Sequence, residues 1–314
     1  MMTTITPAAN ERAPRRARLP VHGLLLLDKP AGLSSNAALQ RARWLLRAAR
    51  AGHTGTLDPL ATGLLPLAFG EATKFCGTLL DADKSYQARV RLGERTETGD
   101  AEGAVLERRA VTVNAADIAQ AASAFCGEIE QVPPMYSALK RDGKPLYAYA
   151  RAGVEVERTP RRVRILALET GDFDAASASF TLHVTCSKGT YIRTLAEDMG
   201  ERLGCGAHLL ALRRTAIGAL RIEDAVTLEA LEATEEAQRE ALLAPVDALL
   251  QDVPALALDG DAARAILHGQ RVRAPQTEGA AGLCRLYRQA AFLGLGEVRA
   301  DGYLYAKRLL ATEG

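Results

Sequence analysis

The most distinctive segment of the chain is Gly52-His53-Thr54-Gly55-Thr56-Leu57-Asp58-Pro59-Leu60-Ala61-Thr62-Gly63. Glycine occupies three of its twelve positions, and because glycine lacks a Cβ it lets a backbone turn tightly or approach another molecule closely. The one acidic side chain, Asp58, lies at the centre, with His53 five residues upstream. Two interpretations are open. Asp58 is either a carboxylate presented for chemistry on a compact loop, or the N-cap of a helix that begins at Pro59.

The composition sets outer limits on the class of protein. A length of 314 residues allows two domains, or one large domain with an appendage. Hydrophobic residues make up 48% of the chain and charged residues 25%, as in a globular protein that buries a core. The formal net charge of +1 gives no sign of a strongly basic nucleic-acid binder. That argument concerns only the total, because binding depends on where the charge lies.

The cysteines and the N-terminus predict the compartment. The five cysteines are odd in number and no two are spaced as CxxC, so neither a disulfide framework nor a zinc site is indicated. We therefore expect reduced thiols, no metal and a cytoplasmic protein. The basic residues 1–20 predict a disordered tail. The apolar run Leu24–Leu27 is too short for a secretion signal, and no segment could span a membrane.

Hydrophobic patterning predicts the main elements. One strand, 84–92, alternates cleanly and puts Tyr86 on its inward face, as a core aromatic or as one that lines a site. The acidic loop 94–103 that follows is expected to be solvated surface. Strands are predicted at about 23–28, 64–69, 84–92, 163–168, 179–186 and 208–214, and helices at about 35–50, 71–80, 115–125, 192–203 and 227–250.

Residues 131–153 differ in kind from the rest of the chain. Pro133-Pro134 is expected to prevent regular structure. Beyond it basic and aromatic residues alternate, and these are the two components of single-stranded RNA recognition, phosphate binding and base stacking. A solvated basic loop with packing tyrosines is the alternative. The residues in question are Lys140, Arg141, Lys144 and Arg151 with Tyr136, Tyr147 and Tyr149.

Two further segments carry site or domain predictions. Tyr191 and Arg193 fall in the first turn of the helix predicted after strand 179–186. Because an Arg is unfavourable at a helix N-terminus, Arg193 is expected to have an acidic partner. After a linker at 252–254, one short helix and several strands predict a small β-rich module at 253–314, which is either an RNA-binding barrel or a packing appendage.

The motifs together resemble those of bacterial tRNA pseudouridine synthase B. They occur in that family's order over roughly residues 23–217, and the last sixty residues match only loosely. The matching motifs are Leu27-Asp28-Lys29-Pro30 with Gly32 and Ser34-Ser35-Asn36, the whole of Gly52 to Gly63, Gly70-Glu71-Ala72-Thr73-Lys74, Lys84 and Tyr86, Gln131-Val132-Pro133-Pro134 with Tyr136-Ser137-Ala138-Leu139-Lys140, Cys186 to Arg193, and Leu212-Arg213-Arg214-Thr215.

The resemblance implies a fold and a reaction. The fold would be an α+β pseudouridine synthase domain at 21–252, with a central mixed, largely antiparallel sheet flanked by helices, and a PUA-like β domain at 253–314. The reaction would be the isomerisation of uridine 55, in the T-loop of tRNA, to pseudouridine. The implied partner is the T-arm stem-loop of tRNA, without membrane, metal or small-molecule cofactor, and a monomer is expected.

The resemblance also implies site residues. Asp58 would be the nucleophile and Arg193 its ion-pair partner. Tyr86 would stack on the extracted base and take part in removing the C5 proton. The remaining members are substrate-binding: Tyr191 and Leu212 as pocket walls, His53 as the residue that helps to extrude the uridine, and Lys29 as a structural or phosphate partner.

Three rival functions remain open at this point. The chain could be an RNA-binding or tRNA-folding protein, although intact Asp58, Tyr86 and Arg193 argue against a loss of catalysis. It could be a guide-RNA-dependent pseudouridine synthase, although residues 131–153 resemble the RNA-contacting loop of the stand-alone enzyme. A glycosidase would need a second positioned carboxylic acid, and none is identifiable in the sequence.

Overall fold

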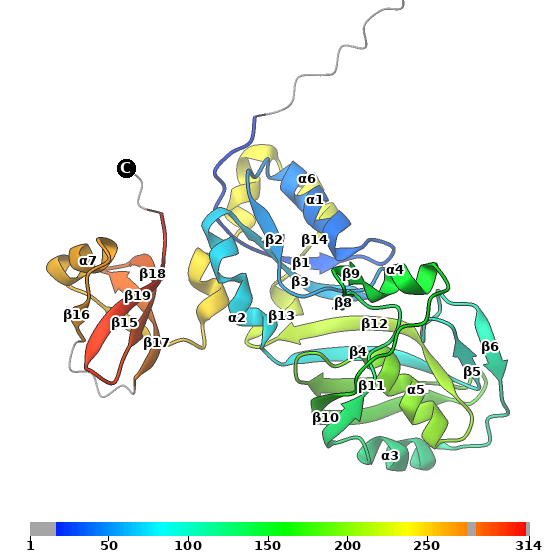
Figure 1. The fold of residues 1–314 in the computed structure, drawn as a ribbon. Helices are drawn as coiled ribbons and strands as arrows, with labels where there is room; N and C mark the ends of the chain where they lie inside the picture. Colours follow the sequence, from blue (N-terminus) through cyan, green and yellow to red (C-terminus); the bar gives the residue numbers. More distant parts are fainter. Residues whose placement is uncertain (1–16, 275–280, 312–314) are drawn as a thin grey trace, which may run out of the picture.

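A ten-stranded mixed sheet organises most of the chain (Figure 1), and the computed structural model describes residues 17–274 and 281–311. Eight strands run in the order β14-β1-β3-β12-β4-β11-β10-β7, with β2 beside β3 and β13 beside β12. The strands are β1 (Gly23–Lys29), β2 (Ala51–His53), β3 (Thr62–Phe69), β4 (Lys84–Leu92), β7 (Gly127–Gln131), β10 (Arg161–Asp174), β11 (Ser179–Cys186), β12 (Ala207–Ile217), β13 (Leu220–Arg221) and β14 (Val226–Thr227).

Most neighbours in this sheet are antiparallel. The exceptions are β1 with β14 and β3 with β12, which run parallel. The predicted mixed, largely antiparallel sheet is therefore confirmed. Two small hairpins lie outside it, β5 (Glu94–Thr96) with β6 (Val105–Arg108), and β8 (Lys140–Arg141) with β9 (Lys144–Pro145).

Helices cover the two faces of the sheet unequally. The larger core lies under α1, α3, α5 and α6, whose apolar residues pack on the inward side chains of β1, β3, β4 and β12. The smaller core lies on the other face, under η1, α2 and η4. The helices are α1 (Ser35–Leu45), η1 (Gly70–Phe75, 3-10), α2 (Cys76–Leu80), α3 (Ala115–Ser123), α4 (Leu146–Arg151), α5 (Ile192–Arg202), η2 (Ile222–Asp224, 3-10), α6 (Leu228–Ala233), η3 (Glu236–Leu242, 3-10), η4 (Val246–Leu250, 3-10) and α7 (Gly260–Leu267).

The C-terminal part forms a separate β module with its own core. Its five strands pair in the order β15-β17-β18-β19-β16, and α7 packs on them. The β-rich nature predicted for this part is confirmed, and the turn at Asp301-Gly302 joins β18 to β19 as expected. Its strands are β15 (Ala255–Ala257), β16 (Val272–Arg273), β17 (Gly282–Arg288), β18 (Ala291–Val298) and β19 (Tyr303–Leu309).

Several sequence-based boundaries were wrong. The helix expected to reach about Arg50 ends at Leu45, because Arg47 adopts a left-handed conformation with φ of 53°. The single helical stretch expected over 227–250 is instead α6 followed by η3 and η4. Of the predicted tail 1–20, residues 1–16 lie outside the described residues. Its last residues are not a loose tail, since Leu19 forms a β-bridge with Ala48.

Two loops also differ from expectation. Residues 131–153 contain the β8–β9 hairpin and α4, so Pro133-Pro134 stops regular structure only locally. The loop 94–103 is not simply solvated surface, because Asp100 is only 3% exposed and Thr96 only 4%. Among the described helices, none combines the length and apolar character needed to cross a membrane.

Candidate active site

The loop that carries Asp58 is not a helix start. Pro59 and Leu60 form a bend, and Ala61 N donates a hydrogen bond to Asp58 O at 3.1 Å. The helix-capping interpretation of Asp58 is therefore wrong. The loop is fixed instead by Ser35, whose hydroxyl accepts from Leu57 N at 2.8 Å and donates to Leu57 O at 3.0 Å.

Lys29 contacts the same loop through its side chain, at Pro59 O. Its side chain is fully buried, and its Nζ donates to Leu33 O at 2.6 Å and Pro30 O at 2.8 Å, with Pro59 O at 3.5 Å. Burial lowers the pKa of Lys29 to about 8, while the negative charges of Asp58 and Glu102 oppose that shift. Of the two roles expected for Lys29, these contacts support the structural one.

Arg193 lies directly beside Asp58. Its Nη2 is 2.9 Å from Asp58 Oδ2, and it enters the site from the first turn of α5. The guanidinium is almost fully buried and also donates to Thr98 O at 2.8 Å and Tyr136 O at 2.7 Å. Because a buried cation is costly without partners, these contacts fix both the position and the orientation of the fork. The acidic partner expected for Arg193 is thus present.

A second carboxylate, missed from the sequence, lies on the other side of this guanidinium. Asp100 Oδ2 is 3.6 Å from Arg193 Nη1. Its own loop holds it in place, because Glu102 N donates to Oδ1 at 3.1 Å and the Thr98 hydroxyl donates to the same oxygen. Burial, together with the charges of Asp100 and Asp58, raises the pKa of Glu102. Only the flanking Gly99 and Gly103 hinted in the sequence that this loop turns inward.

Asp58 opens into a pocket of about 340 Å³. The pocket lies between the Asp58 loop, the ends of β4 and β12, and the start of α5, and residues 137–139 form part of its wall. A larger cleft of about 630 Å³ lies near Asp81 and Asp252, but it contains none of the predicted site residues. The predicted residues that line the smaller pocket are Asp58, Tyr86, Tyr191, Arg193 and Leu212.

Burial affects both tyrosines of the pocket, Tyr86 and Tyr191, and Gln131 fixes the backbone of Tyr191. Burial raises the pKa of Tyr86, and the positive charge of Arg214 opposes the shift. Burial likewise raises the pKa of Tyr191. The backbone of Tyr191 is clamped by Gln131, which accepts from Tyr191 N at 3.0 Å and donates to Tyr191 O at 3.3 Å. This clamp joins the start of the 131–153 segment to the pocket wall.

His53 and Lys29 do not line the pocket. His53 ends β2, where it pairs with Leu67 of β3, and its Nδ1 is 3.1 Å from Gly55 O. It therefore supports the Asp58 loop from outside the pocket in this structure. The catalytic and binding roles implied for the seven site residues stay predictions.

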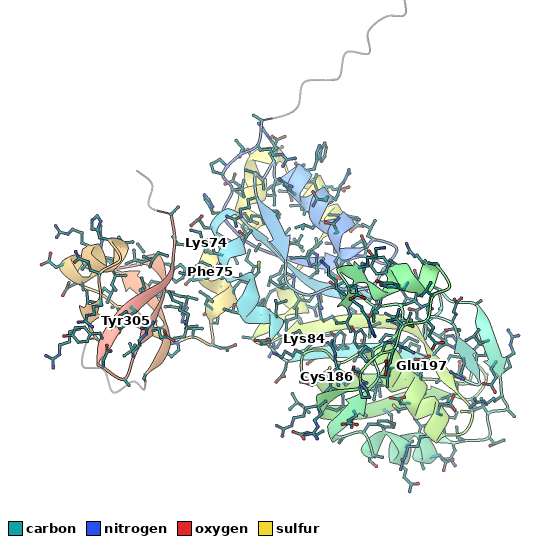
Figure 2. The ribbon with its side chains drawn as sticks, in the orientation of Figure 1. Lys74, Phe75, Lys84, Cys186, Glu197 and Tyr305 are labelled. Atoms are coloured by element: carbon teal, nitrogen blue, oxygen red, sulfur yellow. The ribbon has the colours of Figure 1, made fainter. Side chains whose placement is uncertain are left out.

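Lys84 lies at the pocket end of β4, and its side chain is hydrogen-bonded to backbone carbonyl oxygens. Its Nζ donates to Leu80 O at 2.9 Å and to Ala82 O at 2.5 Å, at the end of α2. Figure 2 shows Lys84 close to Cys186, its partner across β4 and β11. Burial lowers the pKa of Lys84 and raises the pKa of Cys186 to about 11. Within the described part of the chain, no three acidic, His or Cys side chains gather as a metal site requires.

Comparison with known proteins agrees with this architecture. Residues 43–192 match the model of the TruB family pseudouridylate synthase N-terminal domain. Residues 193–251 match the tRNA pseudouridylate synthase B C-terminal domain, and residues 254–310 match the model described as pseudouridine synthase II TruB, C-terminal. The three models thus follow one another from residue 43 to residue 310.

Whole-chain relatives and solved structures extend the likeness. A protein of Cupriavidus metallidurans named tRNA pseudouridine synthase B is 57% identical over 98% of this chain and 99% of its own length. Its namesake in Aromatoleum aromaticum is 59% identical over 95% and 96%. A chain in the crystal structure of a Cbf5-Nop10-Gar1 complex superposes with a TM-score of 0.70 at 25% identity, over 96% of this chain and 91% of that one.

The fold and the matched models define the class as a pseudouridylate synthase with a C-terminal β module. Within that class, near-complete coverage by relatives above 55% identity settles the family. The chain belongs to the TruB family.

Proposed function

We propose that the protein isomerises uridine 55 in the T-loop of tRNA to pseudouridine, with Asp58 as the nucleophile. The observation that carries this proposal is the Asp58–Arg193 pair at the mouth of a pocket walled by Tyr86, Tyr191 and Leu212. Membership of the TruB family supports the reaction and the tRNA substrate. The T-arm and position 55 follow from the resemblance of the motifs.

The reaction breaks the bond from ribose C1′ to uracil N1, turns the base, and joins C1′ to C5. It is redox-neutral and consumes no nucleotide, so a carboxylate that splits it into covalent steps is a sufficient nucleophile. Asp58 attacks the bound nucleotide, and Arg193 fixes the attacking oxygen through a charge-assisted hydrogen bond. The contacts of Arg193 with Thr98 O and Tyr136 O keep that oxygen in place before substrate arrives.

The remaining predicted residues handle the extruded nucleotide. Tyr86 stacks on the uracil and takes part in removal of the C5 proton, and Tyr191 and Leu212 close the pocket around it. Taking a base out of its loop costs a few kcal/mol. His53, at the outer edge of the loop, assists that step, and Lys29 keeps the loop in shape.

Residues 131–153 bind the T-arm next to the pocket. Their basic side chains are exposed on the β8–β9 hairpin, and Arg151 stacks over the Tyr147 ring at 5.5 Å on α4. Tyr136 O and Gln131 tie this segment to Arg193 and Tyr191. RNA binding there is therefore linked mechanically to the catalytic pair. The protein acts alone, as a cytoplasmic monomer, with the C-terminal module as a second RNA contact.

The test uses tRNA labelled with tritium at C5 of the T-loop uridine alone. Wild-type protein should release the label as pseudouridine forms, whereas Asp58→Asn should bind the tRNA with little change and release none. Appreciable release by Asp58→Asn would defeat the nucleophile assignment. Activity of the purified protein on an unmodified transcript also separates it from a guide-RNA-dependent enzyme, which would be silent without its guide.

A further inference from the structure

Arg214 is a buried cation of the pocket that the reaction described above does not use. It lies on β12, where it is the direct cross-strand partner of Tyr86 on β4 and of Gly63 on β3. Its side chain is only 1% exposed, and it lines the pocket that contains Asp58. It therefore lies deep in the pocket, beside the ring expected to stack on the uracil.

The hydrogen bonds of Arg214 are incomplete. Nε donates to Leu64 O at 2.8 Å, but Nη2 is buried and has no hydrogen-bond partner among the described residues. Nη1 lies beside Gly55, since a Cβ added to that glycine would be 3.5 Å from Nη1. Leaving a charged donor buried and unpaired costs more than an ordinary missing hydrogen bond. A group that binds in the pocket is the natural partner for this nitrogen.

The charge of Arg214 is also unmatched. Within the described residues, no carboxylate lies within the 4 Å of an ion pair, in contrast to Arg193 with Asp58 and Arg213 with Asp28. An arginine cannot shed its proton to escape this cost. The neighbouring Lys84 adds positive charge and is already bonded to carbonyl oxygens. The floor of the pocket therefore favours an oxygen that carries or develops negative charge.

The depth of the site distinguishes between the parts of the nucleotide that could supply such an oxygen. Asp58, which must reach the sugar or the base, is 41% exposed at the mouth, whereas Arg214 is almost inaccessible. The phosphates of an extruded nucleotide stay with the RNA backbone outside the pocket, and its base enters first. The exocyclic carbonyl oxygens of uracil are the acceptors that reach deepest.

The chemistry places charge on those same oxygens. If Asp58 attacks C1′, the C1′–N1 bond breaks and its electron pair stays on the uracil ring, shared among N1, O2 and O4. If Asp58 attacks C6 instead, the pair of the C5–C6 double bond moves to C5 and O4. In the first route C5 then attacks C1′ and displaces the carboxylate. In the second route the C1′–N1 bond breaks and C5 bonds to C1′, and the carboxylate leaves C6 when C5 loses its proton and the C5–C6 double bond re-forms. In both routes C5 loses its proton and N1 gains one.

We propose, resting on the proposed function, that Arg214 is a catalytic residue that donates a hydrogen bond from Nη2 to an exocyclic carbonyl oxygen of the extruded uracil. It recognises the base edge and stabilises the negative charge that the ring carries between bond breaking and bond making. Donors aimed at a developing oxyanion in a closed site are worth about 10²- to 10³-fold in rate. The same contact favours uracil over cytosine if O4 is the acceptor, since cytosine presents an amino group there.

The experiment combines a protein change with a substrate change. T-arm stem-loops carry the tritium label at the target base, which is uridine, 2-thiouridine or 4-thiouridine, because sulfur is a weaker acceptor than oxygen. We expect Arg214→Met to lower the single-turnover rate on uridine by about 10²-fold with little change in RNA affinity. One thio-substitution should slow the wild type but not slow Arg214→Met further, and which one does so identifies the oxygen.

Controls separate this from a structural role. Arg213→Met removes the neighbouring arginine, which pairs with Asp28 and does not line the pocket, and it should respond to both thio-substrates as the wild type does. Arg214→Lys, which keeps the charge without the fork, carries the same comparison if Arg214→Met does not fold. The proposal is overturned if 2-thiouridine and 4-thiouridine each slow Arg214→Met by the same factor by which they slow the wild type. Wild-type protein inactive on the uridine substrate would instead overturn the proposed function.

Discussion

At Arg193 one buried guanidinium is shared by two carboxylates of different exposure. Asp58 is 41% exposed and Asp100 only 5% by side chain, while the arginine between them is 6% exposed. The exposed carboxylate can still be hydrated if the arginine is lost, but Asp100 cannot. Under the proposed function the pair with Asp58 serves catalysis, whereas the contact with Asp100 bears on stability.

We accordingly expect Arg193→Ala to reduce single-turnover rate far more than tRNA affinity, and also to lower the free energy of unfolding by about 3 kcal/mol, because it leaves Asp100 buried without a cation. Urea denaturation measures the second effect. The double variant Arg193→Ala/Asp100→Asn, which removes the stranded charge, should regain part of the stability and none of the rate. Equal losses of rate and affinity in Arg193→Ala would identify a simple RNA-binding arginine.

Lys29 gives a prediction in pH. The unfolded chain holds this proton up to about pH 10.5, whereas burial makes the folded protein release it near pH 8. Between those values the unfolded state binds more protons, so the contribution of Lys29 to the free energy of unfolding rises with pH. The full rise is about 3 kcal/mol. Wild type should therefore gain stability relative to Lys29→Met from pH 7.5 to 10, and parallel curves for the two proteins would contradict the burial effect.

The residues of the site could be predicted only in part. Local patterns left Asp58 and Tyr86 open to two interpretations each and predicted only an acidic partner for Arg193; the resemblance of the motifs assigned all three to the site. Asp100 lies in an acidic loop that was expected to be solvated. Arg214 lies in a matching motif, but no role was predicted for it. Their burial follows from pairings between segments distant in sequence, which no local pattern contains.

Among the elements, the parallel pairing of β3 with β12 requires a glycine at position 63. Gly63 has φ of 100°, and a Cβ there would lie 2.3 Å from Arg214 O, inside the contact that makes these strands parallel neighbours. This pairing joins the half of the sheet that carries Asp58 to the half that carries Tyr86. Gly63, the last residue of the segment Gly52–Gly63, is thus required by packing as well as by backbone conformation.

Gly63→Ala should consequently destabilise the protein by more than its backbone strain, which alone is about 1 to 2 kcal/mol. Gly127 is the matched control, since its φ is 96° and an added Cβ meets nothing within 4 Å. We expect Gly63→Ala to unfold at clearly lower urea concentration than Gly127→Ala, and to lose activity as Arg214 shifts. Equal midpoints for the two variants would show that the strands are not so closely apposed.

Elements with a strong period were predictable and those set by tertiary contacts were not. The strands β4 and β11 have the bounds that their alternation predicts, at Lys84–Leu92 and Ser179–Cys186. The stretch 227–250 has helical composition but breaks into short pieces. Arg239 holds the turn there by donating to Thr234 O at 2.9 Å and to Leu45 O at 2.9 Å, a contact across the fold.

At the scale of the whole molecule, the C-terminal module is docked rather than tethered. In Figure 2 Lys74 and Phe75 lie on the side of the catalytic part that faces the module. Lys74 Nζ donates to Leu309 O at 3.0 Å, and Glu71 Oε2 accepts from Ala311 N at 2.6 Å. The rings of Phe75 and Phe292 meet edge to face at 5.6 Å between centroids. The Gly70–Lys74 motif noted in the sequence therefore positions this module.

Phe292 links the two parts, because its ring contacts Phe75 of the larger part at 5.6 Å and Tyr287 of the module at 5.5 Å. Phe292→Ala leaves a void at the joint, and a buried Phe→Ala change costs about 3 to 5 kcal/mol in a full core. We expect calorimetry to show one transition for the wild type and two for Phe292→Ala, with the module melting first. Leu283→Ala, which changes an exposed apolar residue of the same sheet, is the control and should melt as the wild type does.

If the module supplies a second RNA contact in a fixed position, Phe292→Ala should also weaken tRNA binding, with the single-turnover rate at saturating tRNA unchanged. Unaltered binding would confine tRNA recognition to the pocket and to residues 131–153.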